Sequence, residues 1–337
     1  MHAQVDKLLL GNGLTHHECR SLFDALIRGE LSEVEVTALL VALKLKGETP
    51  DEIAGAATAL LDAARDFPKP VYRFADVVGT GGDGASTINI STAVAFVAAE
   101  AGLPVAKHGN RAVSSKCGAA DLLERFGFHL ELSPETARRC LDQTGFCFLF
   151  APHYHGGIRH AMPVRKQLGL RTLFNILGPL VNPARPPIML LGVYDPALCR
   201  PIAESLQLLG CERALVVHGH GLDEIALHGE TVTAELADGR IALRQFSPRD
   251  FGAREYPLAA IVGGSAEENA RAITEVLAGS GQAAHTAAVA INVAALLWIA
   301  GIADSPARGF DQAQSILASG NALRRLERCA VLSRSES

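Results

Sequence analysis

The chain has 337 residues, of which 48% are hydrophobic and 20% are charged, so its composition supports a large buried core and excludes global disorder. Its formal net charge is −5, whereas a protein whose main partner is nucleic acid normally carries a basic excess. The most apolar segment, residues 287–303, contains Asn292 and is short for a membrane span. The sequence therefore predicts a globular protein that binds neither nucleic acid nor a membrane.

The cysteines predict a reducing compartment. There are seven of them, widely spaced and without a Cys-x-x-Cys motif, which favours reduced thiols over disulfides or structural zinc. Residues 1–10 also lack the apolar core and the small-residue cleavage pattern of a signal peptide. Both features predict a cytoplasmic protein.

Residues 1–70 are predicted to form a small helical domain with three short helices, completed by helices near residues 165–185. Each of the three begins with a hydroxyl residue followed three positions later by glutamate, a capping box in which two side chains satisfy free backbone amides. The pairs are Thr15 with Glu18, Ser32 with Glu35, and Thr49 with Glu52. Apolar residues recur at helical spacing behind the first two of these caps, which gives each helix an apolar face that needs a partner.

After residue 70, short β-rich runs alternate with helical runs. Strands are predicted at 76–78, 104–106, 147–150, 188–193 and 214–217, and helices at 91–101, 120–126, 265–277 and 283–301. Residues 231–246 alternate around Asp238-Gly239, which is typical of a hairpin. Strands that alternate with helices favour a largely parallel sheet. Residues 71–332 are therefore predicted to form an α/β domain, followed by a loose polar tail at 333–337.

A glycine-rich loop from Gly79 to Gly84 follows the first predicted strand. It satisfies the Gly-x-Gly-x-x-Gly pattern of dinucleotide sites, and Glu100 lies near the position of a ribose-binding acid. Two features argue against that interpretation. In a dinucleotide site the glycines open the helix directly, whereas here residues 85–89 intervene, and Asp83 would face a pyrophosphate with like charge.

The alternative interpretation of this loop is a phosphate site. Flexible glycines let backbone amides approach a phosphate closely. Residues 89–92 then place small polar side chains at a helix N-terminus, which favours anions. A tight turn with an ordinary helix cap would account for Ser91, but not for four glycines beside Asp83.

A second donor-rich loop, residues 107–118, follows the next predicted strand. It holds three cations, two hydroxyls, an amide and two glycines, a dense supply of donors for an anionic ligand. In open α/β sheets ligands bind beyond the carboxyl ends of the strands. Two such loops after successive strands therefore favour an anion site over a solvated loop.

Together these residues resemble the anthranilate phosphoribosyltransferase family. The segment from Asp76 to Gly127 carries the motifs GTGGDG, NIST, KHGNR and SSKCGAAD. Further matches are residues 150–152, His155, residues 163–165, residues 171–183 and the acidic pair Asp223-Glu224. The motifs occur in order over essentially the full chain, and their joint occurrence is specific although each alone is weak.

The resemblance implies transfer of the phosphoribosyl group of phosphoribosyl pyrophosphate to the amine of anthranilate, a step of tryptophan biosynthesis. It implies a fold like that of nucleoside phosphorylases and phosphoribosyltransferases, with a small N-terminal helical domain, a larger α/β domain with a mainly parallel central sheet, and a cleft between them. It also implies a homodimer and two Mg²⁺ ions per subunit, and it leaves open an association with anthranilate synthase.

The resemblance also implies a set of site residues. The contacts to phosphoribosyl pyrophosphate would be Gly79, Gly82, Asp83, Thr87, Asn89, Ile90, Ser91, Thr92, Lys107, His108, Gly109, Asn110, Arg111, Ala112, Val113, Ser114, Ser115 and Ala119, with residues 107–115 closing over its phosphates. Anthranilate would contact Gly79, Asn110 and Arg165, with His108 and His155 along its entry path. Ser91 and Glu224 would hold one Mg²⁺, and Asp223 with Glu224 a second.

The residue types agree with this chemistry. Mg²⁺ often takes only one or two carboxylates besides phosphates and water, although an adjacent acidic pair without the resemblance would be interpreted as a solvated turn. Arg165 has the planar donors that bind a carboxylate bidentately, and its alternative is a surface ion pair. Three positions depart from the family pattern: Ala119, where a serine is common; Gly156-Gly157; and Ala226, where a small hydroxyl residue is common.

Two other functions remain open on the sequence. One is a pyrimidine-nucleoside phosphorylase, and the other is a non-catalytic relative that binds nucleic acid. Arg165, the acidic pair and the NIST run at residues 89–92 argue against the first, and the net charge of −5 with the intact acidic pair argues against the second. No catalytic acid or base is assigned, because the aromatic amine of anthranilate is already neutral near neutral pH.

Overall fold

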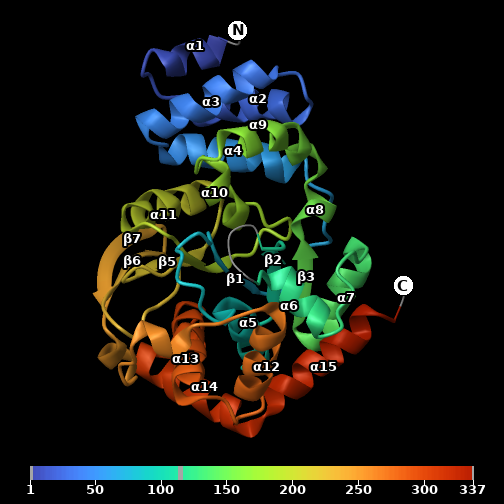
Figure 1. The fold of residues 1–337 in the computed structure, drawn as a ribbon, viewed down its shortest axis with the longest axis vertical. Coiled ribbons are helices and arrows are strands. Elements are labelled where there is room, and N and C mark those ends of the chain that lie inside the picture. The colour runs from blue at the N-terminus through green and yellow to red at the C-terminus, as the bar shows by residue number, and fades with distance from the viewer. Residues whose placement is uncertain (1–2, 113–116, 336–337) are drawn as a thin grey trace.

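The computed structural model describes residues 3–112 and 117–335 (Figure 1). The chain begins with four helices: α1 (Ala3–Leu9), α2 (His16–Ile27), α3 (Glu33–Lys46) and α4 (Pro50–Asp62). The prediction of three helices was wrong by one. Helix α1 begins without a hydroxyl cap and depends instead on the burial of Val5 and Leu8 in the core of the helical domain.

The three predicted capping boxes are confirmed. In each, the hydroxyl of Thr15, Ser32 or Thr49 accepts the amide of the residue three positions on, and the glutamate carboxylate accepts the amide of the cap. Glu52 does more than cap α4. It is fully buried, its Oε1 accepts the amide of Leu14 at 2.9 Å, and its Oε2 accepts the ammonium of Lys46 at 2.8 Å. One carboxylate therefore joins α3, α4 and the loop before α2.

The chain returns to the helical domain after its third strand. Helices α9 (Met162–Leu168) and α10 (Phe174–Leu177) pack against it, and the ring of Phe174 lies 5.9 Å from that of Phe23. Figure 1 shows α9 beside α2, α3 and α4. The division of the chain at residue 70 stays a prediction.

The central sheet has seven strands in the order β3-β2-β1-β4-β5-β6-β7. The strands are β1 (Ala75–Gly79), β2 (Val105–Gly109), β3 (Phe146–Phe150), β4 (Ile188–Gly192), β5 (Arg213–Gly219), β6 (Thr231–Ala237) and β7 (Arg240–Phe246). The first five pair in parallel, and β6 and β7 continue the sheet as an antiparallel hairpin. Asp238 and Gly239 form its turn with φ of 50° and 70°, as the sequence predicts.

Alternate residues of the central strands face two different apolar cores. Leu190 and Leu215 face helices of the C-terminal half, whereas Leu191 and Val216 face α11 (Cys199–Leu208) and the helical domain. The first core is built by α5 (Ile90–Glu100), α6 (Ala119–Arg125), α12 (Ala266–Leu277), α13 (Ala283–Ile299), α14 (Pro306–Ser319) and α15 (Asn321–Ser333). Helices α7 (Pro134–Thr144) and α8 (Ala151–Tyr154) flank β3. In the described parts of the chain, no helix has the length and hydropathy that a membrane crossing requires.

The C-terminus corrects one prediction. Ser333 was expected in a loose tail, but it is the last residue of α15 and is buried. Its hydroxyl accepts the amide of His129 at 3.1 Å and donates to the carbonyl of Ala330 at 2.8 Å. Composition favours a polar residue in solvent, whereas one hydrogen bond from a distant segment and one within α15 satisfy Ser333 inside the fold.

Glu52→Ala is expected to lower the free energy of unfolding by about 3 kcal/mol, because it leaves two backbone amides without their acceptor and the half-buried ammonium of Lys46 without its carboxylate. Urea-induced loss of helical circular dichroism measures the change. Glu33→Ala, which removes an exposed acid from the first turn of α3, is the matched control. Equal losses in the two variants would contradict the role of Glu52.

Candidate functional site

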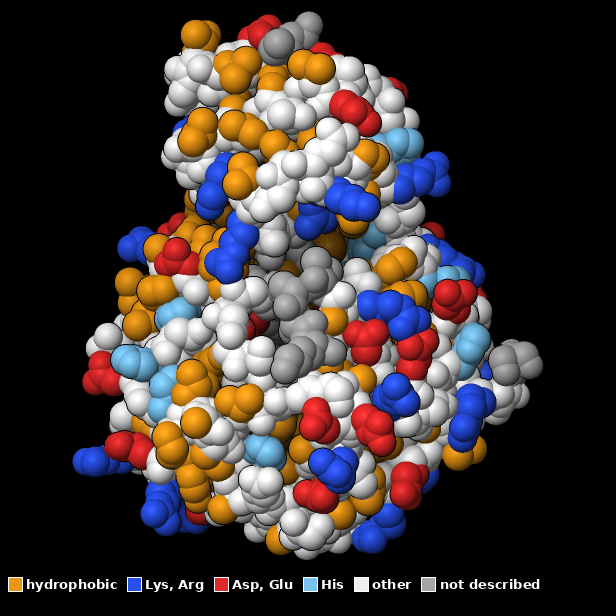
Figure 2. Space-filling view, viewed as in Figure 1, with side chains coloured by type: hydrophobic (Ala, Val, Ile, Leu, Met, Phe, Trp, Pro, Cys, Tyr) orange, Lys and Arg blue, Asp and Glu red, His pale blue; other side chains and the backbone are white. Residues whose placement is uncertain are grey.

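The site lies where the strand order reverses. Strand β1 has β2 on one side and β4 on the other, so the chain winds outward in both directions from this pair. Gly79 and Gly192 end these strands and lie opposite each other in register. In open α/β sheets the crevice beyond such a switch point is where ligands bind. Figure 2 shows a hollow at this level, between the helical domain and the α/β domain, with Lys and Arg side chains along its upper rim.

The two strand-ending glycines make room for the acidic pair. A Cβ atom at Gly79 would collide with the carboxylate of Asp223, and one at Gly192 would collide with the carbonyl of Asp223. The segment after β5 therefore lies directly on the ends of β1 and β4. Sequence reasoning missed Gly192, because nothing in the pattern of β4 distinguishes it from an ordinary strand end.

The glycine-rich loop wraps the same carboxylate. The amide of Gly81 donates to Oδ2 of Asp223 at 2.6 Å, and Gly81, Gly82 and Gly84 all have positive φ. The carboxylate of Asp83 lies close enough to Asp223 to raise the pKa of Asp223. Contact between two acids is unfavourable unless a cation or a shared proton lies between them.

The loop then runs irregularly to Asn89, and α5 begins at Ile90. The glycines therefore do not open the helix, which removes the basis for a dinucleotide site. Glu100 lies at the far end of α5 and pairs with Arg325 at 2.7 Å. Thr87 forms an isolated bridge to Val262, which ties the loop to the segment that precedes α12.

The first turn of α5 lies next to the acidic pair. Asn89 caps the helix by accepting the amide of Thr92 at 3.3 Å, and the amide of Ser91 donates to the carboxylate of Glu224. The side chain of Ile90 is buried in the core, so only its backbone is placed to contact a ligand. The hydroxyl of Thr92 is buried without a hydrogen-bond partner in the described residues.

Lys107 and His108 correct the predicted second loop. With Gly109 they form the end of β2, and the loop begins only at Asn110. Lys107 is 2% exposed, and its ammonium donates to the carbonyl of Val77 at 2.5 Å and to the hydroxyl of Ser91 at 3.0 Å. Hydrophobic periodicity does not predict a buried strand that carries Lys107 and His108. The strand predicted from the sequence therefore ends before them.

The electrostatics of the acidic pair fit a divalent cation. Burial, followed by the charge of Asp83, raises the pKa of Asp223 to about 7. Burial and the charge of Asp223 raise the pKa of Glu224 well above its ordinary range. The charge of Lys107 offsets this only in part at Glu224, and a metal ion would supply the remaining positive charge. The described residues contain no cluster of three or more His, Cys, Asp and Glu side chains that could hold a metal ion. A divalent cation such as Mg²⁺ at the pair would complete its shell with phosphates and water.

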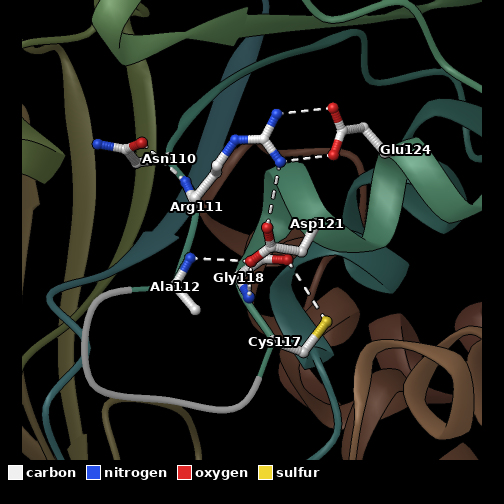
Figure 3. A network of polar contacts seen from close by, with 7 residues as sticks. All are labelled: Asn110, Arg111, Ala112, Cys117, Gly118, Asp121 and Glu124. Carbon is white, nitrogen blue, oxygen red and sulfur yellow. Dashed lines mark hydrogen bonds and ion pairs between the residues drawn. The ribbon is translucent and has the colours of Figure 1, made fainter.

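Asn110, Arg111 and Ala112 lie at the start of the second loop, and Figure 3 shows Arg111 directed toward α6. Its guanidinium forms two bonds with Glu124, at 2.5 and 2.7 Å, instead of facing the acidic pair. Asp121 accepts the amides of Ala112 and Gly118, each at 2.9 Å, and so joins the two ends of the loop. Asp121 was missed as a loop anchor. The predicted contacts Val113, Ser114 and Ser115 lie outside the described residues.

The rings of His108 and His155 lie next to each other. The sequence predicts both along one entry path, and that role stays a prediction. Their rings are 5.2 Å apart, edge to face, and both are buried. Nδ1 of His108 pairs with the carbonyl of Gly178 at 3.2 Å, and Nε2 of His155 with that of Val181 at 2.8 Å. Each ring therefore donates through that nitrogen and keeps the other as an unprotonated acceptor. Burial and the neighbouring His155 lower the pKa of His108 to about 3.

Arg165 lies on α9 with its guanidinium 4.8 Å from the ring centre of Phe174. No acidic side chain in residues 3–112 and 117–335 pairs with it, and burial lowers its pKa. The predicted alternative, a surface ion pair, is therefore absent from the described structure. An arginine stacked on an aromatic ring and without a carboxylate is suited to bind one.

Arg171 is a contact that the sequence did not single out. Its guanidinium donates to the carbonyl of Gly82 and stacks 4.4 Å from the ring centre of Tyr194. It thus connects the segment after α9 to the glycine-rich loop. Ala119 begins α6 beside Gly109, where its methyl group takes the place of the hydroxyl expected from the family pattern.

Comparison with known proteins identifies the class first. A family model described as the helical bundle domain of a glycosyl transferase family matches residues 5–64, and one described as its a/b domain matches residues 71–323. The helical domain and the mainly parallel sheet are thus those of a glycosyltransferase with two domains.

The particular family follows from the relatives. The anthranilate phosphoribosyltransferase of Aeromonas salmonicida is 54% identical over 100% of both chains, and that of Photobacterium profundum is 56% identical over 97% of this chain and 96% of the relative. The solved structure from Thermus thermophilus has a TM-score of 0.95 at 43% identity and covers 99% of this chain and 100% of that one. The Saccharomyces cerevisiae enzyme in complex with PRPP and Mg has a TM-score of 0.90 at 30% identity, covering 98% and 97%. The chain belongs to the anthranilate phosphoribosyltransferase family.

The depressed pKa of His108 predicts a pH dependence of stability. Below its ordinary pKa of about 6.5, the unfolded chain binds a proton that folded His108 binds only near pH 3, because its folded pKa is about 3. The free energy of unfolding therefore falls as pH decreases from 6.5 toward 3. We expect His108→Gln to lose less thermal stability than the unchanged protein between about pH 7.5 and about pH 5. His17→Gln, at an exposed site, should show the same slope of thermal stability against pH as the unchanged protein. Equal slopes in the two variants and the unchanged protein would refute the prediction.

Proposed function

We propose that this protein transfers the phosphoribosyl group of 5-phosphoribosyl 1-pyrophosphate to the amine of anthranilate, giving N-(5-phosphoribosyl)anthranilate and pyrophosphate in tryptophan biosynthesis. The observation that carries the proposal is the convergence of the acidic pair, the glycine-rich loop and the N-terminus of α5 at one switch point. The named relatives have this activity, and none of those named is a nucleoside phosphorylase or a nucleic-acid-binding protein.

The pyrophosphate donor is proposed to bind along the β1 and β2 ends. Its contacts are the family positions between Gly79 and Thr92 and between Lys107 and Ala119 that were named from the sequence. The glycine amides and the N-terminus of α5 supply donors for its phosphates. We propose two Mg²⁺ ions per subunit, one held by Ser91 and Glu224 and one by Asp223 and Glu224. When bound, magnesium neutralises charge that develops on the leaving pyrophosphate.

Anthranilate is proposed to bind between the two domains. Arg165 would bind its carboxylate, with Gly79 and Asn110 completing the contact, and His108 and His155 would line the way in. The imidazoles stay neutral at the pH of the cell because burial lowers the pKa of both. Their unprotonated nitrogens can accept a hydrogen bond from the amine. No side chain is assigned as a catalytic base, so positioning and electrostatic stabilisation account for the rate.

The test is the fluorescence of anthranilate with purified protein, phosphoribosyl pyrophosphate and Mg²⁺. We expect fluorescence to decrease only when all are present and to stay constant with a chelator. Replacing both acids, Asp223→Ala with Glu224→Ala, should reduce turnover by about a hundredfold or more and weaken its dependence on Mg²⁺.

The control for that variant is Glu230→Ala, an exposed acid a few residues beyond the pair. It should keep both turnover and Mg²⁺ dependence. Constant fluorescence with the folded, unchanged protein would overturn the proposed activity. An unaltered Mg²⁺ dependence in the double variant would overturn only the metal assignment.

The helical domain carries the surface proposed for a homodimer. Leu10, directly after α1, is 80% exposed, and Val34 and Leu45 on α3 are 71% and 83% exposed. Helices α1 and α3 pack against each other, so these side chains belong to one region of the domain, where Figure 2 shows several hydrophobic groups. Exposed apolar side chains concentrated in one region are typical of an interface between chains. A cytoplasmic location is also proposed, since none of the seven cysteines, all of which lie in the described part of the chain, is in a disulfide. An association with anthranilate synthase stays open.

Leu10→Glu with Leu45→Glu is expected to convert the dimer to a monomer, because two buried charges would face the partner without counter-ions. Size-exclusion chromatography with light scattering should show the mass halved. Val331→Glu, which alters a side chain 62% exposed on α15, should leave the mass unchanged. A dimer that persists in the double variant would place the interface elsewhere.

A further inference from the structure

A buried side-chain amide on α13 contacts the segment that carries the acidic pair. Asn292 interrupts the most apolar segment of the sequence, residues 287–303, and is fully buried within the helix. Its Oδ1 accepts the backbone amide of Ile225 at 3.0 Å, and its Nδ2 donates to the carbonyls of Ala288, at 2.9 Å, and Ile225, at 3.5 Å. An unpaired amide in such a helix would cost free energy. These bonds satisfy it, and they join α13 to the backbone directly after Glu224.

Two successive backbone amides after the acidic pair are bound by buried side chains. Asn292 accepts the amide of Ile225. The hydroxyl of Thr231, at the start of β6, accepts the amide of Ala226 at 3.1 Å. Helix α13 also packs against β4, β5 and α5, the elements whose ends lie around the acidic pair. Asn292 therefore connects a supporting helix of the site to the backbone of the pair, one residue beyond it.

We propose that Asn292 is a positioning residue for the metal site: by binding the backbone of Ile225, it fixes the position of the acidic pair at the ends of β1 and β4. This inference rests on the proposed function, which places Mg²⁺ at the pair. Mg²⁺ requires nearly ideal octahedral geometry, so two carboxylates on adjacent residues share the ion well only when their backbone is held in place. Asn292 contributes no ligand and acts through Ile225, as the outer-shell partners of metal sites do.

Asn292→Leu tests this role, because leucine has nearly the same size, suits the apolar surroundings and removes the acceptor of the Ile225 amide. We expect the Mn²⁺ affinity of the folded variant to fall about tenfold, the scale on which the loss of an outer-shell partner acts. The amide of Ile225 should also exchange its hydrogen faster, because the bond that protects it is gone. This second readout needs no metal.

The matched control is Thr144→Val, which also removes a buried polar group. The hydroxyl of Thr144 donates to the carbonyl of Cys140 at 2.6 Å and to that of Phe146 at 3.2 Å. Phe146 begins β3, so these bonds lie at the opposite edge of the sheet from the site. Thr144→Val should lose stability and keep the Mn²⁺ affinity of the unchanged protein, which separates positioning from general destabilisation.

The experiment measures Mn²⁺ binding to the full-length protein by electron paramagnetic resonance of the free ion, without substrates, at a temperature at which circular dichroism shows each variant folded. Hydrogen–deuterium exchange of the metal-free protein, followed by mass spectrometry over residues 219–228, reports the amide of Ile225. In transfer assays, the Mg²⁺ concentration for half-maximal turnover should rise about tenfold in Asn292→Leu, while the KM for anthranilate stays unchanged.

Unchanged Mn²⁺ affinity in folded Asn292→Leu would overturn the inference, and so would an equal loss of affinity in Thr144→Val. If Asn292→Leu does not fold, Asn292→Ala, which leaves room for a water molecule, is judged by the same two measurements. Failure of the proposed function appears instead as absent transfer in an unchanged protein that still binds Mn²⁺. If the unchanged protein binds no Mn²⁺, both the metal assignment and this inference are wrong.

Discussion

The structure depends on holding two adjacent carboxylates, Asp223 and Glu224, largely out of water at the ends of β1 and β4. Burying negative charge costs free energy, and the surrounding elements offset that cost in part. Gly79 and Gly192 leave space for the pair, the amides of Gly81 and Ser91 donate to it, and Lys107 lies beside it. These donors do not neutralise it, since the pKa of both acids remains raised. The residual demand for positive charge is the physical basis on which a metal site is proposed here.

A single stretch of backbone, residues 171–184, connects that pair to the helical domain. Arg171 contacts the glycine-rich loop, the carbonyls of residues 178 and 181 hold the two buried histidines, and Asn182 holds Asp76. The proposed donor site and the proposed path of the acceptor are thus positioned by the same segment. A shift of this segment would move both, which gives the two-domain arrangement a direct role in bringing the substrates together.

Much of the fold could be predicted because local rules dominate it. The three capping boxes and the turn at Asp238-Gly239 depend only on neighbours in sequence, and all are confirmed. Elements without such signals were missed or shortened. Helix α1 depends on tertiary burial, β2 continues through Lys107 and His108 because partners outside the strand satisfy them, and Ser333 is buried for the same reason.

The sequence by itself determined the class of fold, the presence of two donor-rich segments after successive strands and, through its ordered motifs, the family. These features depend on residue types and on their spacing along the chain, which the sequence contains in full. Only the tertiary structure decided how charges and space are shared among distant segments: Gly192 leaves room for Asp223, Asp121 joins the ends of a loop, Arg111 pairs with Glu124, and Asn182 holds Asp76. Each of these joins different elements of the fold, and electrostatic balance in a buried site depends on distances in space that no local pattern contains.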